Sequence, residues 1–354
     1  MKKKASVTKP SEILDIEKSW NFKIIDVNNK ESVPKGGVRN TFEMNDTGDV
    51  ISLMLFELDI KDHSKLSNFK HLTRLSLTRC NVTDLAFLKE NSKLEELFLG
   101  GNHILYIENL SNLNKLLQLA IWNNPIVDIQ SISTIKTLES LFCQDINLEN
   151  IEFLSHLSNL KTLNLSNNRI VDISIINTLK KLKQLSCANN FIHSIEPLDN
   201  LNELKKLDLN HNLIKNIPHS LAAKFNWLED AVSESRRRTS FSVDEDEELS
   251  IEISLHENPL EFPPNSVIEL GPETVENYYE NSKLFGYSPL SEGRIIVVGD
   301  GSAGKSSLIE KILYGTFELG KSQTNGIKIE KWKLSHKDKR ELVFNIWDFG
   351  GQEI

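Results

Sequence analysis

Leucine recurs every 22 residues through the first two-thirds of the chain, and Val50 stands one period before the series. The recurring positions are Leu72, Leu94, Leu116, Leu138, Leu160, Leu182 and Leu204. Each opens the pattern L-x-x-L-x-L-x-x-N-x-I-x-x-I. Apolar residues at alternate positions predict a short strand with one buried face. A fixed period of this length predicts one strand per turn of a solenoid, with each turn stacked on the next.

Asparagine occupies the position in most of these units where the chain must turn after the strand. Its amide can hydrogen bond backbone groups that a tight turn leaves unpaired. The residue is kept at Asn102, Asn124, Asn168, Asn190 and Asn212, and it is replaced by Leu58, Cys80 and Ile146. This is the pattern of a leucine-rich repeat. We expect the turns that lack asparagine to be satisfied in another way.

The 22-residue spacing, and the places where it begins and breaks, divide the chain into segments. Residues 1–49 are expected to form an N-terminal cap segment, with a helix from Glu12 to Trp20, and residues 50–270 the repeats. The period breaks at about 229–248, where an Arg-Arg-Arg-Thr-Ser run is followed by acidic residues; this predicts a solvated insertion. Residues 271–292 are expected to connect the repeats to the rest of the chain, with a helix from Thr274 to Leu284 that caps the core.

A different pattern begins at Arg294, where a continuous apolar run ends in glycine and is followed by apolar residues at helical spacing. The sequence GDGSAGKSS between them fits the phosphate-binding pattern G-x-x-x-x-G-K-[ST]. The alternative is a Gly-rich turn between two buried elements, but a strand, a loop and a helix N-terminus are the context that the motif needs. The residues expected to hold the nucleotide here are Gly299, Asp300, Gly301, Ser302, Ala303, Gly304, Lys305, Ser306 and Ser307.

A second apolar run, from Glu341 to Trp347, predicts a strand that ends at Asp348. Asp-x-x-Gly at a strand end suits a carboxylate facing Mg²⁺ and a Gly351 N–H facing the γ-phosphate. Gln352 stands where a water-orienting glutamine would lie, and Thr324 is the candidate switch threonine that closes over the metal ion. We therefore expect Gln352 and Thr324 to be catalytic, and Ser306, Thr324 and Asp348 to hold Mg²⁺.

Composition and charge narrow the possible partners and the possible location of the protein. A net charge of −9 without a basic stripe argues against a nucleic-acid partner, and no apolar run is long enough to span a membrane. The basic N-terminus is not followed by the apolar stretch of a secretory signal. Cys143 and Cys187 occupy one inward repeat position two turns apart, too far for a disulfide, and Cys80 lies further off. Free core thiols favour a reducing compartment, most simply the cytoplasm.

The repeats also predict a binding surface. Outward strand positions carry Phe56, Phe98, Trp122 and Phe142 in the first repeats. In the later repeats they carry polar residues, namely Asn164, Ser166, Ser186, Asp208 and Asn210. Aromatic side chains gathered on one face are candidate anchors for a protein partner on the concave side of the solenoid. The alternatives are scattered surface aromatics, or a face covered by the N-terminal segment.

Leucine-rich repeats followed directly by these phosphate motifs resemble the Roco family, whose Ras-like domain is called Roc. The resemblance rests on Asn258-Pro-Leu260 with Pro263-Pro264, the Tyr278-Tyr279 helix, GDGSAGKSS, Thr324-Asn-Gly-Ile327 with Trp332, and Asn345-Ile-Trp-Asp-Phe-Gly-Gly-Gln-Glu353. It implies an α/β protein: a leucine-rich-repeat solenoid followed by the N-terminal part of a P-loop, Ras-like GTPase domain at 293–354. It implies GTP/GDP and Mg²⁺ as cofactors, and a parent protein that is a homodimer through a further C-terminal domain called COR.

Two functional classes remain open. One is a Roco-type GTPase, a nucleotide switch coupled to protein recognition; the other is a repeat-only scaffold with a non-functional GTPase remnant. The guanine-reading Asn-Lys-x-Asp motif is absent, so we expect the 354-residue chain to hydrolyse no GTP. An ATPase that pairs repeats with a large nucleotide-binding domain is disfavoured, because such enzymes usually end this strand in consecutive acidic residues rather than in Asp-Phe-Gly-Gly-Gln.

Overall fold

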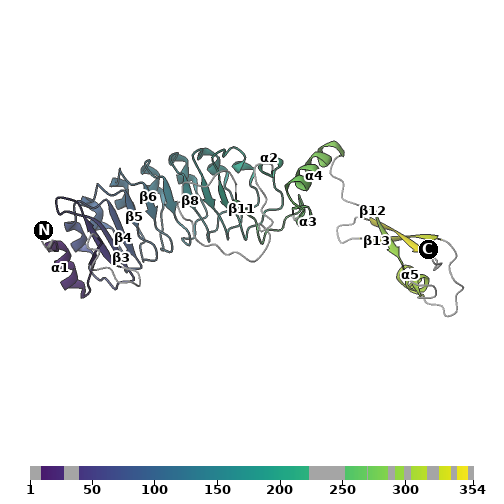
Figure 1. Ribbon diagram of the computed structural model, residues 1–354, viewed down its shortest axis with the longest axis horizontal. Helices are drawn as coiled ribbons and strands as arrows, with labels where there is room; N and C mark the ends of the chain where they lie inside the picture. The colour runs from purple at the N-terminus through teal and green to yellow at the C-terminus, as the bar shows by residue number, and fades with distance from the viewer. Residues whose placement is uncertain are drawn as a thin grey trace, which may run out of the picture. The chain divides into compact units, whose positions relative to one another are not determined.

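The computed structural model describes residues 9–27, 40–222, 252–268, 270–285, 292–298, 304–316, 327–335 and 341–349 (Figure 1). The chain separates into two compact units, Met1–Glu280 and Asn281–Ile354, and each is described by itself. The expected insertion at about 229–248 lies outside the described residues. Within the described part, no helix is both long and apolar enough to cross a bilayer.

The first unit is built on one 11-stranded sheet whose strands follow one another in chain order. Strand β2 runs antiparallel to β3, and every later neighbour pairs in parallel. The strands are β1 (Ile25–Asp26), β2 (Thr41–Met44), β3 (Val50–Phe56), β4 (Arg74–Thr78), β5 (Glu96–Phe98), β6 (Gln118–Ala120), β7 (Ser140–Phe142), β8 (Thr162–Asn164), β9 (Gln184–Ser186), β10 (Lys206–Asp208) and β11 (Glu252–Ser254). This architecture confirms the solenoid.

The register of the sheet reproduces the sequence period. Leu97 pairs with Leu75 on one side and with Leu119 on the other, in steps of 22 residues. All three side chains are fully buried. Because each strand sets the same positions beside its neighbour, the inward leucines form one continuous core along the sheet.

Short 3₁₀ helices return the chain from each strand to the next, because a period of this length leaves little room for a longer crossover. They are η1 (Ser64–Asn68), η2 (Ala86–Glu90), η3 (Glu108–Asn112), η4 (Gln130–Thr134), η5 (Glu152–His156), η6 (Ser174–Thr178) and η7 (Glu196–Leu198). Each buries one aliphatic side chain at the same point of the repeat, such as Leu110 or Leu154. The core therefore lies between the strands and these helices.

The recurring asparagine of the repeat makes the hydrogen bonds that the sequence predicts. Asn102 Nδ2 donates to the carbonyl oxygens of Leu77 and Leu99, each at 2.7 Å. Its Oδ1 accepts from the backbone N–H groups of Cys80 at 2.9 Å and Val82 at 3.0 Å. Asn124, Asn168, Asn190, Asn212 and Asn258 make the corresponding bonds. The side chains form a ladder that joins each turn to the one before it.

Two repeats without this asparagine turn differently. Cys80 and Ile146 are each followed by an asparagine with a left-handed backbone, Asn81 at φ 57° and Asn147 at φ 58°. Asparagine tolerates this conformation better than other non-glycine residues. The Nδ2 of Asn81 also donates to Asp59 Oδ1 at 2.7 Å. These two turns therefore differ in backbone conformation from those with the asparagine, and their satisfaction by another group stays a prediction.

Both ends of the repeat core are covered. Helix α1 (Ser11–Trp20) lies where the sequence predicts a helix, and it buries Ile13 and Ile16 in the core. At the other end stand α2 (His219–Ala222), α3 (Asn265–Ile268) and α4 (Pro272–Phe285). Val275 and Tyr279 of α4 are buried and belong to the same apolar core as the repeats.

The second unit contains a three-stranded sheet in the order β12-β14-β13. The elements are β12 (Glu292–Val297), α5 (Lys305–Tyr314), β13 (Ile327–Ser335) and β14 (Glu341–Phe349). β12 and β14 are parallel, and β13 runs antiparallel to β14. Parallel neighbours place their carboxyl ends at one edge of the sheet, which is where α/β proteins bind ligands.

Candidate functional site

The phosphate motif lies at this edge. Val297, the last residue of β12, pairs with Asp348 near the end of β14. Gly304 precedes α5 with φ 83° and ψ 14°, a left-handed conformation in which glycine carries no steric penalty. The strand, glycine and helix N-terminus that the sequence predicts are therefore present. The N-terminal turn of a helix favours an anion, because its first backbone N–H groups point out of the helix end.

Ser306 and Asp348 meet at this edge although they come from different elements. The Ser306 hydroxyl donates to Asp348 Oδ2 at 2.5 Å. The Asp348 side chain is only 3% exposed, and its Oδ1 has no hydrogen-bond partner among the described residues. A buried carboxylate oxygen without a partner is costly unless a ligand satisfies it. Two of the three expected metal ligands thus lie together.

The donor set fits Mg²⁺. A hydroxyl and a carboxylate are hard oxygen ligands, and Mg²⁺ is commonly bound through one or two such groups together with phosphate oxygens and water. Ser306 Oγ and Asp348 Oδ1 would supply the protein's share of that coordination. The free oxygen of Asp348 is the observation that separates this arrangement from a simple serine–aspartate hydrogen bond.

The structure describes part of the predicted site. Lys305, Ser306 and Ser307 are the first residues of α5 and are half-buried. Several predicted residues lie outside the described part of the chain, namely Gly299, Asp300, Gly301, Ser302, Ala303, Thr324, Gly351 and Gln352. Their assignments, including the catalytic ones of Thr324 and Gln352, stay predictions.

The four aromatic residues predicted to bind a partner are half-buried and belong to the repeat unit. Phe98 and Phe142 occupy the same strand position on β5 and β7, and Ala120 of β6 lies between them in the register. The two phenylalanines are thus two strand spacings apart, roughly 10 Å, across a single methyl group. Ala120 is only 4% exposed, so its methyl group is covered by neighbouring side chains.

Trp122 packs against a glycine of the neighbouring turn. A Cβ added to Gly100 would lie 2.0 Å from Cε2 of Trp122, so the indole ring occupies the space that a side chain would fill. From the repeat two before that of Trp122, the Arg79 guanidinium carbon lies 5.8 Å from the centre of the Trp122 ring, and Arg79 Nη1 is 3.1 Å from Glu57 Oε1. Phe56 lies at the end of β3, on the same sheet.

Sequence reasoning found Trp122 but missed Gly100 and Ala120. The signal was available, because Gly100 stands one repeat before Trp122 and Ala120 stands one repeat from each phenylalanine. Small residues at outward positions of a strand mark places where a neighbouring side chain or a ligand comes close.

Family models identify both parts of the chain. The model described as "Ras of Complex, Roc, domain of DAPkinase" matches residues 294–354, and a model of leucine-rich repeats in two copies matches residues 180–223. The chain joins leucine-rich repeats to Roc-domain sequence, the order of the Roco family. A Roc domain implies guanine-nucleotide binding.

Individual relatives match parts of this chain. A probable serine/threonine-protein kinase, pats1 of Dictyostelium discoideum, is 27% identical over 123 residues, which cover 29% of this chain and 4% of that protein. The Ras-related protein Rab-28 of Caenorhabditis elegans is 31% identical over 61 residues, 17% of this chain and 25% of Rab-28. The chain thus spans a quarter or less of the length of these relatives.

Solved structures similar to this chain are leucine-rich-repeat proteins. Internalin C2 of Listeria monocytogenes is 30% identical with a TM-score of 0.41, covering 45% of this chain and 69% of that one. The Leptospira interrogans protein LIC12759 is 19% identical with a TM-score of 0.45, covering 61% of this chain and 55% of that one.

Proposed function

We propose that the Roc segment binds GTP and GDP with Mg²⁺ and acts as a nucleotide switch for protein recognition by the repeats. The observation that carries the proposal is the contact of Ser306 with a buried Asp348 whose second oxygen is free. Ser306 and Asp348 would hold Mg²⁺, which neutralises charge on the phosphates when bound. Lys305 would reach the β- and γ-phosphates from the start of α5, and Thr324 and Gln352 would sense the γ-phosphate.

The nucleotide assignment is tested by Lys305→Ala in the full-length protein that contains this chain. Removing the ammonium group should weaken binding of a fluorescent GDP analogue at least tenfold, about 1.4 kcal/mol. Lys331→Ala is the matched control, because Lys331 is an exposed lysine of β13 in the same unit. Equal affinities of the Lys305→Ala variant and the original protein would refute the assignment. The repeat-scaffold alternative predicts that neither protein binds nucleotide.

The partner surface is the strand face that carries Phe98 and Phe142. Its half-buried aromatic rings offer apolar area without belonging to the core, as anchors of an interface do. Trp122 is already packed on Gly100 and stacked by Arg79, so little side-chain entropy would be lost when a partner binds. An aliphatic or aromatic side chain of the partner would pack against the half-buried rings of Phe98 and Phe142.

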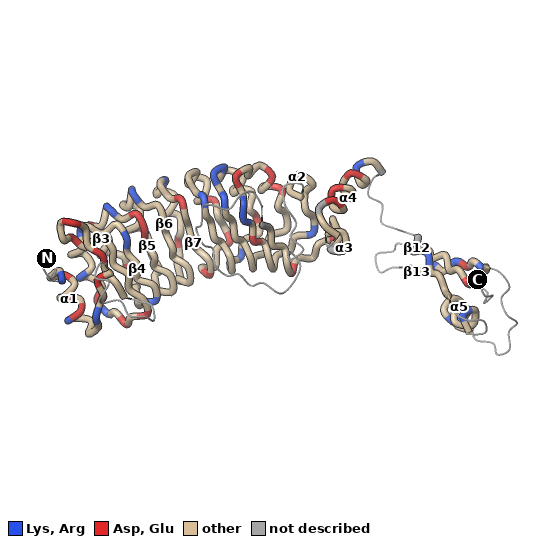
Figure 2. The backbone as a smooth tube through the Cα atoms, in the orientation of Figure 1, with Lys and Arg blue, Asp and Glu red and all other residues tan. Residues whose placement is uncertain are grey.

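The same sheet favours an acidic partner. Lys183 and Lys205 stand at one repeat position immediately before β9 and β10, and Lys206 follows Lys205. No ion pair is found for these three lysines within the described residues, whereas Lys161 one repeat earlier pairs with Glu139 at 2.8 Å. Basic segments recur on the turns to the right of β7 in Figure 2. Carboxylates of the partner would reduce the repulsion between these neighbouring positive charges.

The partner surface is tested by replacing Trp122 and Phe98 with alanine together. We expect the double variant to bind at least tenfold more weakly to a partner that the original protein captures. Phe191→Ala should leave that binding unchanged. Phe191 is an exposed phenylalanine of the repeats, outside the strands. Binding that survives the double substitution would remove this face from consideration.

Two further parts of the proposal concern the parent protein. Homodimerisation through a COR domain is implied only by the resemblance, and the mass of the full-length protein in solution tests it. The cytoplasm is proposed because Cys80, Cys143 and Cys187 are free and buried in the repeat core. Burial raises the pKa of all three thiols, that of Cys80 to about 11, so they stay protonated and inert at neutral pH.

A further inference from the structure

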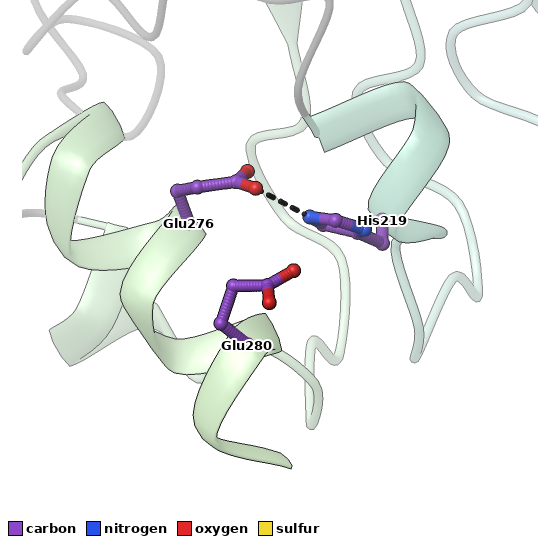
Figure 3. Close-up of side chains that lie close together, drawn as sticks. All are labelled: His219, Glu276 and Glu280. Atoms are coloured by element: carbon purple, nitrogen blue, oxygen red, sulfur yellow. Dashed lines mark hydrogen bonds and ion pairs between the residues drawn. The ribbon is translucent and has the colours of Figure 1, made fainter. Parts of the chain in front are cut away.

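A histidine and two glutamates converge where α4 packs on the end of the repeats. His219 begins α2, and Glu276 and Glu280 lie one helical turn apart on α4. Figure 3 shows the imidazole ring and both carboxylates pointing toward one another. One ligand atom from each residue lies within 4.8 Å of the other two. Among the described residues, this is the one group of His, Cys, Asp and Glu side chains with such spacing.

The sequence explains why these groups face one another. Residues four apart on a helix project from the same side, so Glu276 and Glu280 share the face of α4 that looks toward α2. Tyr279, which lies between them in the sequence, is buried and donates its hydroxyl to the carbonyl oxygen of Ile217. That anchor fixes the rotation of α4 against the last repeat, and with it the direction of both carboxylates.

The histidine ring is held in place as well. The rings of His219 and Tyr279 are 4.8 Å apart between centres, and Phe262 packs edge-on against Tyr279 at 5.2 Å. This packing turns the His219 Nε2 toward α4, where it lies 2.9 Å from Glu276 Oε1. Three ligands therefore come from rigid elements rather than from a loop, and water can reach the group because the Glu276 side chain is 48% exposed.

We propose that His219, Glu276 and Glu280 bind a divalent transition-metal ion, with Zn²⁺ as the representative ion and water in the fourth position. An imidazole with two carboxylates is a ligand set that Zn²⁺ accepts, whereas Mg²⁺ and Ca²⁺ prefer oxygen ligands throughout. Binding requires neutral His219 with its Nε2 lone pair directed at the ion, so the proton moves to Nδ1 and the hydrogen bond to Glu276 is exchanged for coordination.

Tetrahedral coordination at zinc distances places ligand atoms roughly 3.4 Å apart. The His219–Glu276 pair must open slightly from 2.9 Å, and Glu280 must approach by a rotation of its side chain, which its exposed position permits. The ion would then fasten α4 to the last repeat at its polar margin. Tyr279 does the same at the buried margin, so the cap would be held on both sides.

The test is calorimetric titration of the full chain with ZnCl₂, without nucleotide, for the original protein and three variants. We expect one zinc ion to bind, with affinity reduced at least tenfold in Glu280→Gln and in His219→Asn. Glu273→Gln should bind normally. It removes the same charge from the same helix, but Glu273 is not one of the three converging residues. Titration with MgCl₂ should show no binding that these variants change.

The proposal is overturned by three results. The first is a protein that binds no zinc, in which case the three residues form only a hydrogen-bonded ion pair. The second is zinc binding that both site variants retain, which would place the ion elsewhere. The third is an equal loss of zinc affinity in all three variants, which would mean that zinc responds to the overall negative charge and not to these three ligands. Because Glu280 is exposed, Glu280→Gln should leave the fold intact, which circular dichroism checks.

Discussion

Replacing Asn190 with alanine should destabilise the repeat unit strongly, although the residue contacts no ligand. Its Nδ2 donates to the carbonyl oxygens of Leu165 and Cys187, both at 3.0 Å, and its Oδ1 accepts from the N–H of Ile170 at 3.0 Å. Asn190 is only 5% exposed, so water cannot replace the lost partner freely. The substitution leaves one buried backbone N–H and two buried carbonyl groups without the side-chain amide that was their hydrogen-bond partner.

The magnitude follows from those three groups. A buried polar group left unsatisfied costs about 1–3 kcal/mol, and the small cavity admits at most partial compensation by water. Counting about 1 kcal/mol for each group gives a loss near 3 kcal/mol in the free energy of unfolding. In urea, with a slope of about 1–3 kcal/mol per molar, the midpoint should fall by about 1 M or more.

The assay is urea unfolding of the chain followed by circular dichroism, with Asn114→Ala as the control. Asn114 is exposed and its side chain makes no hydrogen bond among the described residues, so its loss should cost less than about 0.5 kcal/mol. A similar small change for both variants would refute the reasoning, because it would mean that the backbone groups find other partners. The repeats built on Cys80 and Ile146 differ at this point, because the residue that follows has a left-handed backbone.

Three further outcomes are expected. Asp348→Asn in the full-length protein should abolish the dependence of nucleotide affinity on Mg²⁺, measured by titration with and without the metal ion, and an unchanged dependence would remove Asp348 from the metal site. Burial lowers the pKa of His63, despite its hydrogen bond to the Cys80 carbonyl; its contribution to stability is therefore present above the unfolded value near 6.5 and is lost as the pH falls below it. Urea midpoints at pH 7 and pH 5 should differ less in His63→Phe than in the original protein, and an equal difference would exclude His63 as the cause. Tyr279→Phe should expose α4 to protease earlier than Tyr278→Phe does, because it is the Tyr279 hydroxyl that bonds Ile217.

Much of the repeat unit could be predicted because its physics is local and repeated. The inward leucines, the turn asparagines and the two capping helices each follow from spacing or amphipathic pattern within one period. The contact of Trp122 with Gly100 joins neighbouring turns, and its geometry depends on a rotamer that the pattern does not fix. The substitute turns at Asn81 and Asn147 depend on a left-handed backbone that the repeat pattern does not specify.

The two candidate sites also differ in how far the sequence predicts them. The phosphate motif predicted a helix start after Gly304, and the two motifs together predicted that Ser306 and Asp348 share one metal ion, because each motif has a known role at the phosphates. The group of His219, Glu276 and Glu280 was invisible in the sequence, since 57 positions separate His219 from Glu276. Its members come together only through the packing of α4 on the last repeat, which no local pattern encodes.

The pairing of β10 with β11 has a practical consequence. Leu207 lies beside Ile253, a step of 46 residues, whereas each parallel step from β3 to β10 is 22, yet the hydrogen-bonded register continues unchanged. The sheet therefore tolerates extra chain between Ala222 and Glu252. This is the place at which to insert a fluorescent reporter or an affinity tag, or to divide the gene into two co-expressed fragments. Each fragment would carry intact turns on its side of the division, and reassembly across β10 and β11 could be followed directly.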